Sequence, residues 1–453
     1  MKINNCNTVK LDKQMEYLKE LILDDEYNDD FFKVINLEAG CGKSVKTKEI
    51  LSTFKKNNKK GIYVVERNAD ALEAEKIINK LANENIALAI NTDAFNSRQF
   101  NKIKDELVNY NVLIISHEKY KVLAIDKRQR EYFTKDRTIL IIDEYLNMAT
   151  NVLTINKDYI DTFETMLGHR ALRELYAECV SEIEDYLLLD KKKNTFFNSK
   201  QDYKTICKKI NKLKNLTQKT LTREYVKSIK TTKNKILQQI EDLKQFYNQT
   251  CVSEGNIIYC TDKRYNYWLL DNNIILDATA NITEAYKLNN IFHIYNQSKI
   301  LNYKDWFFYV INANSNSSAK CKYIDFYEKV NKMIIKKDIK NTLVIGNKND
   351  EDNINATYKN HFGNITGSNE YKDLKNCIIV HNPNVPYRTY ALEYLYYSNK
   401  KIDNRGNWNG YRDDSGDNMV YRFCNKKIER YRINYCATQI YQAIKRVNRD
   451  MSK

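Results

Sequence analysis

The sequence contains few of the residues that interrupt regular structure, with only 2 prolines and 11 glycines among its 453 residues. This composition excludes a collagen-like chain and a Pro/Gly-rich low-complexity chain. No apolar run reaches the roughly eighteen residues that a membrane-spanning helix needs, and the opening MKINNCNTVKLDKQ has no apolar signal region. We therefore expect a cytoplasmic protein.

The 10 cysteines are scattered, and no two of them form a C-x-x-C pair. Their spacing indicates neither a zinc ribbon nor an iron-sulfur cluster. In a reducing compartment we expect them to be buried small residues or free thiols.

Apolar and aromatic residues are abundant, with 42% hydrophobic residues, 34 tyrosines and 16 phenylalanines. This content is enough to bury sizeable cores, so the chain is not expected to be disordered. A chain of this length is expected to form two or three domains.

The formal net charge of +16 and the isoelectric point near 9.1 suggest a polyanionic partner, most simply nucleic acid. An alternative explanation is codon bias, because the abundance of Lys, Asn, Ile and Tyr is typical of an AT-rich genome. The distribution of charge is therefore more informative than its sum.

Strand-like apolar runs alternate with helical segments, which predicts parallel sheets covered by helices. A first series comprises residues 31–37, 62–65, 112–115, 138–142 and 274–276. A second series follows a break near residues 285–305 and comprises 307–311, 343–345 and 377–380. We expect an α/β fold with two parallel-sheet domains.

The segment 151–255 has few β signals, and its apolar residues recur at helical spacing. It predicts a helical insertion in the first domain, so the expected domains are 1–150, 151–255, 256–300 and 301–453. Within it, residues 191–236 carry many lysines against Asp202 and Glu224 as their acids. This region is interpreted either as a nucleic-acid contact or as a solvated lysine face.

The stretch EAGCGKS lies between a predicted strand and a predicted helix, where a phosphate-binding loop belongs. Gly40 and Gly42 let the backbone N–H groups face an anion. Lys43 can reach the β and γ phosphates, and the Ser44 hydroxyl can ligate magnesium. The first glycine of the G-x-x-x-x-G-K-[ST] pattern is Leu37 here. The alternative is an ordinary turn with an exposed lysine.

A pair of carboxylates ends the apolar run TILIIDEYL. Asp143 is expected to hold Mg²⁺, and Glu144 to orient and deprotonate an attacking water. A solvated strand terminus is the alternative for an isolated Asp-Glu pair, but the preceding loop favours the catalytic interpretation.

The C-terminal stretch QAIKRVNRD places Gln442, Arg446 and Arg449 at i, i+4 and i+7 of an expected helix, so they share one face. Grouped arginines can stabilise charge that develops on a γ phosphate. A basic surface helix is the alternative.

The segments EAGCGKS, IDEYL, LDATA and QAIKRVNR, in this order, resemble motifs I, II, III and VI of superfamily 2 helicases and translocases. The resemblance covers both α/β domains, and Q-x-x-x-R-x-x-R is its most specific part. Motif VI usually has glycine where this chain has Lys445. The insertion between motifs II and III resembles that of the XPD and DinG group, although no cysteines match the iron-sulfur cluster of XPD proteins.

The resemblance implies two RecA-like domains with ATP bound between them. The residues implied to bind ATP are Gln14, which is similar to an adenine-reading glutamine, and Ala39, Gly40, Cys41, Gly42, Lys43 and Ser44, with Mg²⁺ on Ser44 and Asp143. Those implied in catalysis are Lys43, Asp143, Glu144, Gln442, Arg446 and Arg449, with Asp277 and Thr279 in coupling. Those implied to contact nucleic acid, in YVVERNADALEAE, VLIISHEKY and GNITGSNEYKD, are Arg67, Asn68, Ser116, His117, Ser368 and Asn369.

We therefore expect an ATP-dependent helicase, with DNA as its nucleic acid, in the replication or processing of phage, plasmid or other mobile-element DNA. Replication or defence proteins are its expected partners. An ATP-driven translocase that does not separate strands, with RNA as another track, and an ATP-gated sensor or loader are the alternatives. A small-molecule kinase would not need the second domain with its paired arginines.

Overall fold

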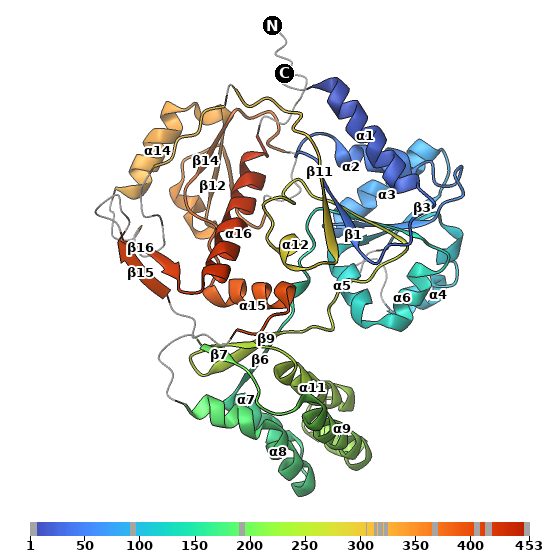
Figure 1. Ribbon diagram of the computed structural model, residues 1–453, viewed down its shortest axis with the longest axis vertical. Helices are drawn as coiled ribbons and strands as arrows, with labels where there is room; N and C mark the ends of the chain where they lie inside the picture. Colours follow the sequence, from blue (N-terminus) through green and yellow to red (C-terminus); the bar gives the residue numbers. More distant parts are fainter. Residues whose placement is uncertain are drawn as a thin grey trace. The chain divides into compact units, whose positions relative to one another are not determined.

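The computed structural model describes residues 7–90, 97–189, 195–304, 306–311, 315, 320, 325–364, 370–402, 408–412 and 419–447. The chain divides into two compact units. The first comprises Met1–Leu146, Tyr267–Asn384 and Ile433–Lys453, and the second comprises Asn147–Asn266 and Val385–Arg432. Figure 1 shows the helices and strands coloured along the sequence.

The first unit contains a parallel sheet in which the described residues supply seven strands, in the order β11-β1-β10-β5-β2-β4-β3. Their bounds are β1 Phe32–Asn36, β2 Gly61–Val65, β3 Ala87–Ile90, β4 Val112–Ser116, β5 Ile139–Asp143, β10 Asn272–Leu276 and β11 Phe292–Asn296. The central strands are buried on both faces, which explains why their sequences are continuous apolar runs instead of alternating ones. This sheet confirms the first predicted series.

Helices cover both faces of this sheet. One face packs against α1 Thr8–Leu23, α2 Lys43–Leu51 and α3 Asn68–Ala82 in a shared apolar cluster. The other face is covered by α5 His117–Ile125, with α6 Lys127–Thr134 next to it. Two short helices, α4 Ser97–Ile103 and α12 Ala285–Leu288, complete the helices described around the sheet. The result is the helix-sheet-helix layering of an α/β domain.

A second parallel sheet in the same unit has the order β13-β12-β14 among the described residues, with β12 Thr342–Gly346, β13 Tyr358–His361 and β14 Asn376–Ile379. Helix α14 Phe326–Lys336 packs on one face through Ile334 against Val344. The end of α16 Lys426–Ile444 packs on the other face, where Ala443 meets the cluster of Leu343 and Ile345. The predicted α/β class with two parallel sheets is confirmed.

Two strand predictions are wrong. Residues 307–311 form no strand in the described structure, and their side chains are exposed, reaching 94% for Val310. An apolar run becomes a strand only where a partner pairs with its backbone, and no described strand does so here. Conversely, β11 lies inside the predicted break, where the sequence FHIYN hides an edge strand that pairs with β1.

The second unit contains an antiparallel sheet, in the order β6-β9-β8-β7 among the described residues, and a group of helices. Its elements are β6 Val152–Asn156, α7 Lys157–Met166, α8 Arg170–Leu188, β7 Thr195–Phe197, α9 Tyr203–Thr220, α10 Arg223–Ser228, α11 Lys233–Tyr247, β8 Cys251–Glu254, β9 Ile257–Thr261, α15 Tyr387–Ser398, β15 Trp408–Arg412 and β16 Met419–Phe423. The helical spacing predicted for the insertion is confirmed by α9, whose Ile206, Ile210 and Leu213 are fully buried.

The compact units group residues differently from the predicted domains, because Val385–Arg432 clusters with the insertion instead of with the second sheet. The predicted domain boundaries stay predictions. No helix in the described ranges is long and apolar enough to cross a membrane.

Candidate functional site

Three neighbouring strands of the first sheet bring three candidate site segments of the sequence to one edge. Strand β10 lies between β1 and β5, with Leu276 in register with both Ile35 and Asp143. Because the strands are parallel, the residues that follow β1, β5 and β10 meet at their carboxyl ends, the usual ligand position in α/β sheets. The phosphate-loop candidate, the carboxylate pair and the LDATA segment therefore share one edge.

The loop after β1 has the backbone of an anion site. Gly40 and Gly42 take φ values of 86° and 82°, which glycine adopts without strain. Gly42 is the N-cap of α2, so the first backbone N–H groups of that helix point into the loop without intrahelical partners. Cys41 is buried against Met15 of α1 and Ile300, which ties the loop to two other segments. Ala39 is half-buried within the same loop.

Lys43 is buried, with an exposed fraction of 5%, and its Nζ lies between two groups of the neighbouring strands. It donates a hydrogen bond to the Leu276 carbonyl at 3.3 Å and lies 3.6 Å from Oε1 of Glu144. The lysine thus points along the sheet edge, toward the carboxylate pair. The alternative of an exposed lysine on an ordinary turn does not fit this burial.

Asp143 is buried at the end of β5. Tyr63 of β2 donates a hydrogen bond to its Oδ2 at 2.8 Å. Burial raises the pKa of Asp143, whereas Lys43 and a hydrogen bond from the Ser44 hydroxyl lower it. The carboxylate and the Ser44 hydroxyl are thus neighbours, as the magnesium prediction for these two residues requires.

Glu144 has a left-handed backbone with φ of 69°, which is uncommon for a residue with a Cβ. A hydrogen bond from its N–H to the Leu276 carbonyl, 3.0 Å long, holds this conformation. Its side chain is 26% exposed, unlike that of Asp143. Strained backbone of this kind is concentrated at functional sites, and here it turns a carboxylate toward Lys43.

The LDATA segment adds a buried carboxylate after β10. Oδ1 of Asp277 accepts hydrogen bonds at 2.7 Å from both the N–H and the hydroxyl of Thr279. Burial, followed by the charge of Glu144, raises the pKa of Asp277, and Lys43 lowers it. Asp277 and Thr279 therefore belong to the same electrostatic group as the loop lysine.

The segment after β4 packs against the end of β5. Ser116 is the N-cap of α5, and His117 is buried with its Nε2 3.0 Å from the Asp143 carbonyl. Burial lowers the pKa of His117 to about 4, so the ring is neutral at pH 7. This position supports the carboxylate strand, and a nucleic-acid contact from Ser116 and His117 stays a prediction.

The segment after β2 is more accessible. Arg67 is exposed at the N-cap of α3, 3.5 Å from Asp70, and Asn68 is half-buried. The exposure of Arg67 is compatible with a contact to nucleic acid, and this contact stays a prediction for both residues. Burial raises the pKa of Glu66, one residue earlier, and the charges of Arg67 and of Arg446, which follows α16, lower it.

Gln14 of α1 is buried, and its Nε2 donates hydrogen bonds to the carbonyl and the hydroxyl of Ser298 at 2.8 and 3.1 Å. Its Oε1 is also buried but has no hydrogen-bond partner within the described part of the chain. The amide is therefore oriented with an unused acceptor. The predicted adenine contact of Gln14 would use this atom.

The predicted arginine face of the C-terminal helix needs correction. Helix α16 ends at Ile444, so Arg446 lies in the following turn instead of on the same helix as Gln442. Arg446 is buried, with an exposed fraction of 4%, and its N–H bonds the Ala443 carbonyl at 3.1 Å. Arg449, Ser368 and Asn369 lie outside the described residues.

Sequence reasoning missed the residues that bring α16 to the phosphate loop. Tyr441 hydrogen-bonds the Ala39 backbone, and the charge of Glu38 helps burial to raise the pKa of Tyr441 to about 12. Lys445 donates a hydrogen bond to the Tyr303 hydroxyl at 2.8 Å, and that hydroxyl donates to Glu38 at 2.7 Å. The sequence signal that could have revealed these contacts is Lys445, at a position where motif VI usually has glycine.

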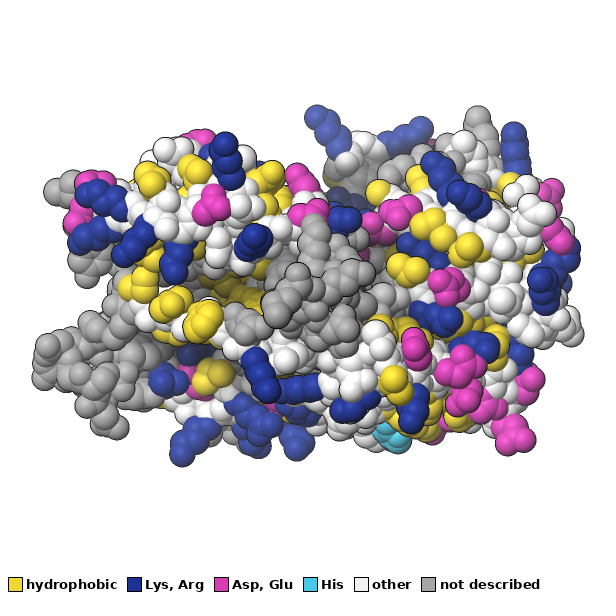
Figure 2. All heavy atoms as spheres, turned by 90° about the horizontal axis from the view of Figure 1, so that it is seen from above, with side chains coloured by type: hydrophobic (Ala, Val, Ile, Leu, Met, Phe, Trp, Pro, Cys, Tyr) yellow, Lys and Arg dark blue, Asp and Glu magenta, His cyan; other side chains and the backbone are white. Residues whose placement is uncertain are grey.

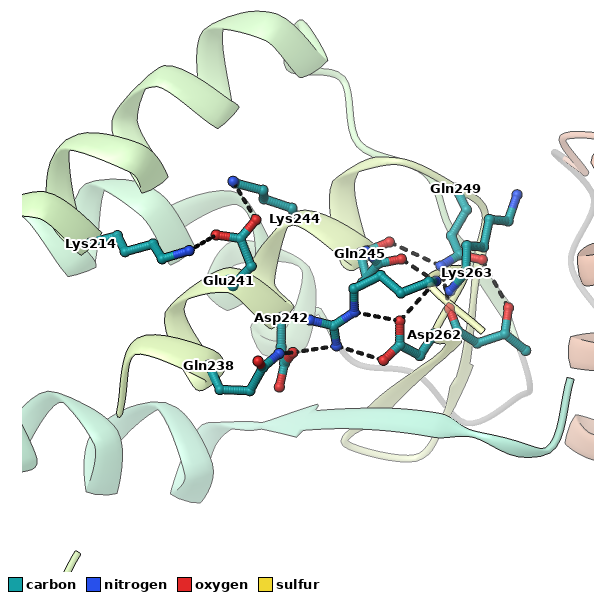
Figure 3. Close-up of polar contacts among 11 residues, drawn as sticks. Lys214, Gln238, Glu241, Asp242, Lys244, Gln245, Gln249, Asp262 and Lys263 are labelled. Atoms are coloured by element: carbon teal, nitrogen blue, oxygen red, sulfur yellow. Dashed lines mark hydrogen bonds and ion pairs between the residues drawn. The ribbon is translucent and has the colours of Figure 1, made fainter. Parts of the chain in front are cut away.

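The basic insertion lies in the second unit, and part of its charge is already paired. Figure 3 shows Lys214 and Lys244 directed at Glu241, and the N–O distance from Lys214 is 2.7 Å. Arg264 bridges Asp242 and Asp262 at 2.6 and 2.5 Å in the same network. Lys214 is therefore a structural ion-pair residue, which weakens its case as a phosphate contact.

The outer face of α9 carries the unpaired charge of this region. Four exposed lysines lie on it at i, i+4, i+8 and i+15: Lys204, Lys208, Lys212 and Lys219. None of them forms an ion pair with a residue that the structure describes. On the face drawn in Figure 2, by comparison, basic side chains occur among acidic and hydrophobic ones, so net charge alone does not define a binding track.

No family model matches the chain, and no curated protein matches it at a significant level. Among solved structures, "XPD_APO" aligns with a TM-score of 0.51 at 13% identity, covering 95% of this chain and 92% of that one. "XPD_Helicase" aligns with a TM-score of 0.47 at 11% identity, covering 96% and 94%. At this identity the first alignment shows the fold. This chain therefore has the fold of that XPD structure, and the segment predicted as an insertion lies between β5 and β10.

Proposed function

We propose that this chain is a nucleic-acid-dependent ATPase that works as a helicase on DNA. The observation that carries the proposal is the meeting of Lys43, the Asp143-Glu144 pair and Asp277 at one edge of the first sheet, with Tyr441 and Arg446 of the C-terminal segment against that edge. A phosphate-binding loop, two carboxylates with different exposure and a buried arginine are the parts that ATP hydrolysis requires.

The residues present fit ATP and magnesium. The N-terminus of α2 and the glycines of its loop suit the phosphates, and the unused Oε1 of Gln14 suits the exocyclic amine of adenine. Carboxylate and hydroxyl oxygens are ligands that Mg²⁺ prefers, so Asp143 and Ser44 would hold the ion. A bound Mg²⁺ would neutralise charge on the phosphate oxygens.

The ion pair between Lys43 and Glu144 would keep the proposed base occupied until ATP binds. When the phosphates of ATP bind, Lys43 has a stronger anionic partner and leaves Glu144. The partly exposed Glu144 carboxylate is then available to orient a water molecule and accept its proton. Asp143, which is more deeply buried, keeps the role of holding the metal.

Arg446, in the turn after α16, would complete the site. Its guanidinium is buried, and it interacts with Glu66 at the edge where the first sheet ends. A buried arginine beside the γ phosphate would stabilise the charge that develops in the transition state. Asp277 and Thr279 would transmit the state of the phosphate site along the loop after β10.

A role in the replication or processing of phage, plasmid or other mobile-element DNA rests on the AT-rich composition. Replication or defence proteins would be its partners.

The test is to measure ATP turnover without nucleic acid, with single strands and with duplexes of DNA and RNA, and to measure strand displacement on a forked duplex. We expect single-stranded DNA to stimulate turnover and the fork to be unwound. Stimulated turnover without displacement would support a translocase instead, and nucleotide-dependent strand binding without stimulation would support a sensor or loader. An absence of ATP hydrolysis under every condition would contradict the proposal.

A further inference from the structure

One face of α16 lies toward the first sheet, and it is not the face predicted from the arginine spacing. Asn434, Tyr441 and Lys445 lie at i, i+7 and i+11, a spacing that keeps side chains on one side of a helix. Asn434 donates a hydrogen bond at 2.6 Å to Glu284, which follows the LDATA segment by four residues. Lys445 continues this side because its N–H still bonds the Tyr441 carbonyl at 3.0 Å.

Glu38, the first residue of the phosphate loop, is the centre of a second set of contacts. Its Oε2 accepts hydrogen bonds from the N–H groups of Ile300 and Leu301 at 2.7 and 2.8 Å. Its Oε1 accepts a hydrogen bond from the Tyr303 hydroxyl at 2.7 Å. One carboxylate therefore joins the phosphate loop to the segment that connects the two sheets.

Lys445 joins the same network from the other side. Its exposed fraction is 6%, and its Nζ donates to the Tyr303 hydroxyl at 2.8 Å. The ammonium also lies 4.5 Å from the ring centre of Tyr303 and 5.4 Å from that of Trp306, where cation-π attraction stabilises it. A buried cation held this way fixes the backbone that carries the next residue, Arg446.

We infer that Glu38, Tyr303 and Lys445 form a positioning relay that sets Arg446 against the phosphate loop, a role that rests on the proposed ATPase function. The Tyr303 hydroxyl is the link, since it donates to Glu38 and accepts from Lys445 at the same time. A movement of the phosphate loop on nucleotide binding reaches Arg446 through this hydroxyl. Lys445 thus has a specific task at a position where related motifs usually have glycine.

The variant Tyr303→Phe isolates this link because it removes the hydroxyl and keeps the ring beneath Lys445. We expect strand-stimulated kcat to fall about tenfold, the size associated with losing hydrogen bonds to charged groups, with the KM for ATP changed less than about threefold. Lys445→Met should give the same pattern. Tyr396→Phe is the matched control, because its hydroxyl donates one hydrogen bond to the Tyr265 carbonyl within the second unit, and it should leave kcat unchanged.

The background variant Arg446→Ala separates positioning from a general structural effect. If the relay acts through Arg446, adding Tyr303→Phe to Arg446→Ala causes no further loss of kcat. An equal tenfold loss in both backgrounds, or a wild-type kcat in Tyr303→Phe, would overturn the inference. A raised KM with unchanged kcat would overturn it as well.

A binding measurement keeps this test distinct from that of the proposed function. Trp306 packs edge-on against Tyr303, with ring centres 5.5 Å apart, so its fluorescence reports on the relay without hydrolysis. Addition of ADP with Mg²⁺ should change the emission of the wild type but not of Tyr303→Phe, and Trp306→Phe identifies the contribution of this ring. If wild-type protein shows this pattern but no ATP turnover, the relay stands and the ATPase proposal fails. If Tyr303→Phe responds like the wild type, the relay fails.

Discussion

Lys43 and Glu144 are 3.6 Å apart at the carboxyl edge of the first sheet, one from the loop after β1 and one from the residue after β5. Strand β10 separates their strands, and its last residue, Leu276, accepts hydrogen bonds from the Lys43 Nζ and from the Glu144 N–H. The loop cation and the proposed base are therefore held by one residue of the strand between them. This arrangement makes the two residues the first targets for mutation.

Lys43→Ala should abolish hydrolysis and weaken ATP binding, because the β and γ phosphates lose their cation. Glu144→Gln should bind ATP and magnesium with near-wild-type affinity and lose turnover, because the amide cannot accept a proton. Binding by fluorescent ATP analogue and turnover by phosphate release measure the two effects. Turnover near the wild-type rate in Glu144→Gln would exclude Glu144 as the base.

Arg446→Ala should bind nucleotide and single-stranded DNA almost normally and lose most of the strand-stimulated rate. An arginine that stabilises the charge of the transition state contributes little to ground-state binding, so the loss of rate should reach about a thousandfold. The measurement is turnover at saturating ATP and strand. A loss of only a few-fold, with ATP binding unchanged, would show that Arg446 does not act on the γ phosphate.

The exposed lysines of α9 provide a test of nucleic-acid binding outside the ATP site. Replacing Lys204, Lys208, Lys212 and Lys219 with Gln should weaken strand binding and reduce its salt dependence by roughly one unit for each lost phosphate contact. Lys214→Gln is the control on the same helix, because Lys214 is already paired with Glu241. An unchanged salt slope in the fourfold variant would identify a solvated lysine face.

Glu393 gives the second unit a predictable pH dependence. This carboxyl is buried and accepts hydrogen bonds from Tyr431 and Asn147 at 2.8 Å, and burial raises its pKa to about 6. Because the folded pKa lies above the unfolded one, the native state binds the proton more tightly, and stability falls as pH rises from about 4.5 to 6. The loss attributable to Glu393 is about 2 kcal/mol.

Glu393→Gln should therefore remove this dependence. Its free energy of unfolding relative to the wild type should increase between pH 4.5 and pH 7, as measured by urea denaturation at several pH values. A constant difference between the two proteins over this range would show that Glu393 does not titrate there.

The sequence predicted the parts of this fold that depend on local pattern. The buried parallel strands are continuous apolar runs, and the loop before α2 has the glycines that its positive φ values require. What the sequence left out depends on tertiary partners. Strand β11 needs the edge of β1 to form, residues 307–311 pair with no described strand, and Val385–Arg432 clusters with the insertion only in three dimensions.

The same distinction holds for the site. The phosphate loop and the carboxylate pair are each contiguous in sequence, and the structure brings them together as a parallel sheet must. The Glu38–Tyr303 and Tyr303–Lys445 contacts join residues that are 265 and 142 positions apart, so no spacing rule reveals them. The arginine prediction assumed that the helix continues, whereas α16 ends at Ile444.

The most direct test of the central claim is the ratio of ATP turnover with saturating single-stranded DNA to turnover without nucleic acid, measured for the full-length wild-type protein and for Glu144→Gln. The account predicts that the strand raises the wild-type rate at least about tenfold, as closure of the site brings Arg446 to the γ phosphate, and that Glu144→Gln shows no turnover in either condition. A wild-type rate that is the same with and without the strand, or turnover that survives in Glu144→Gln, would contradict it.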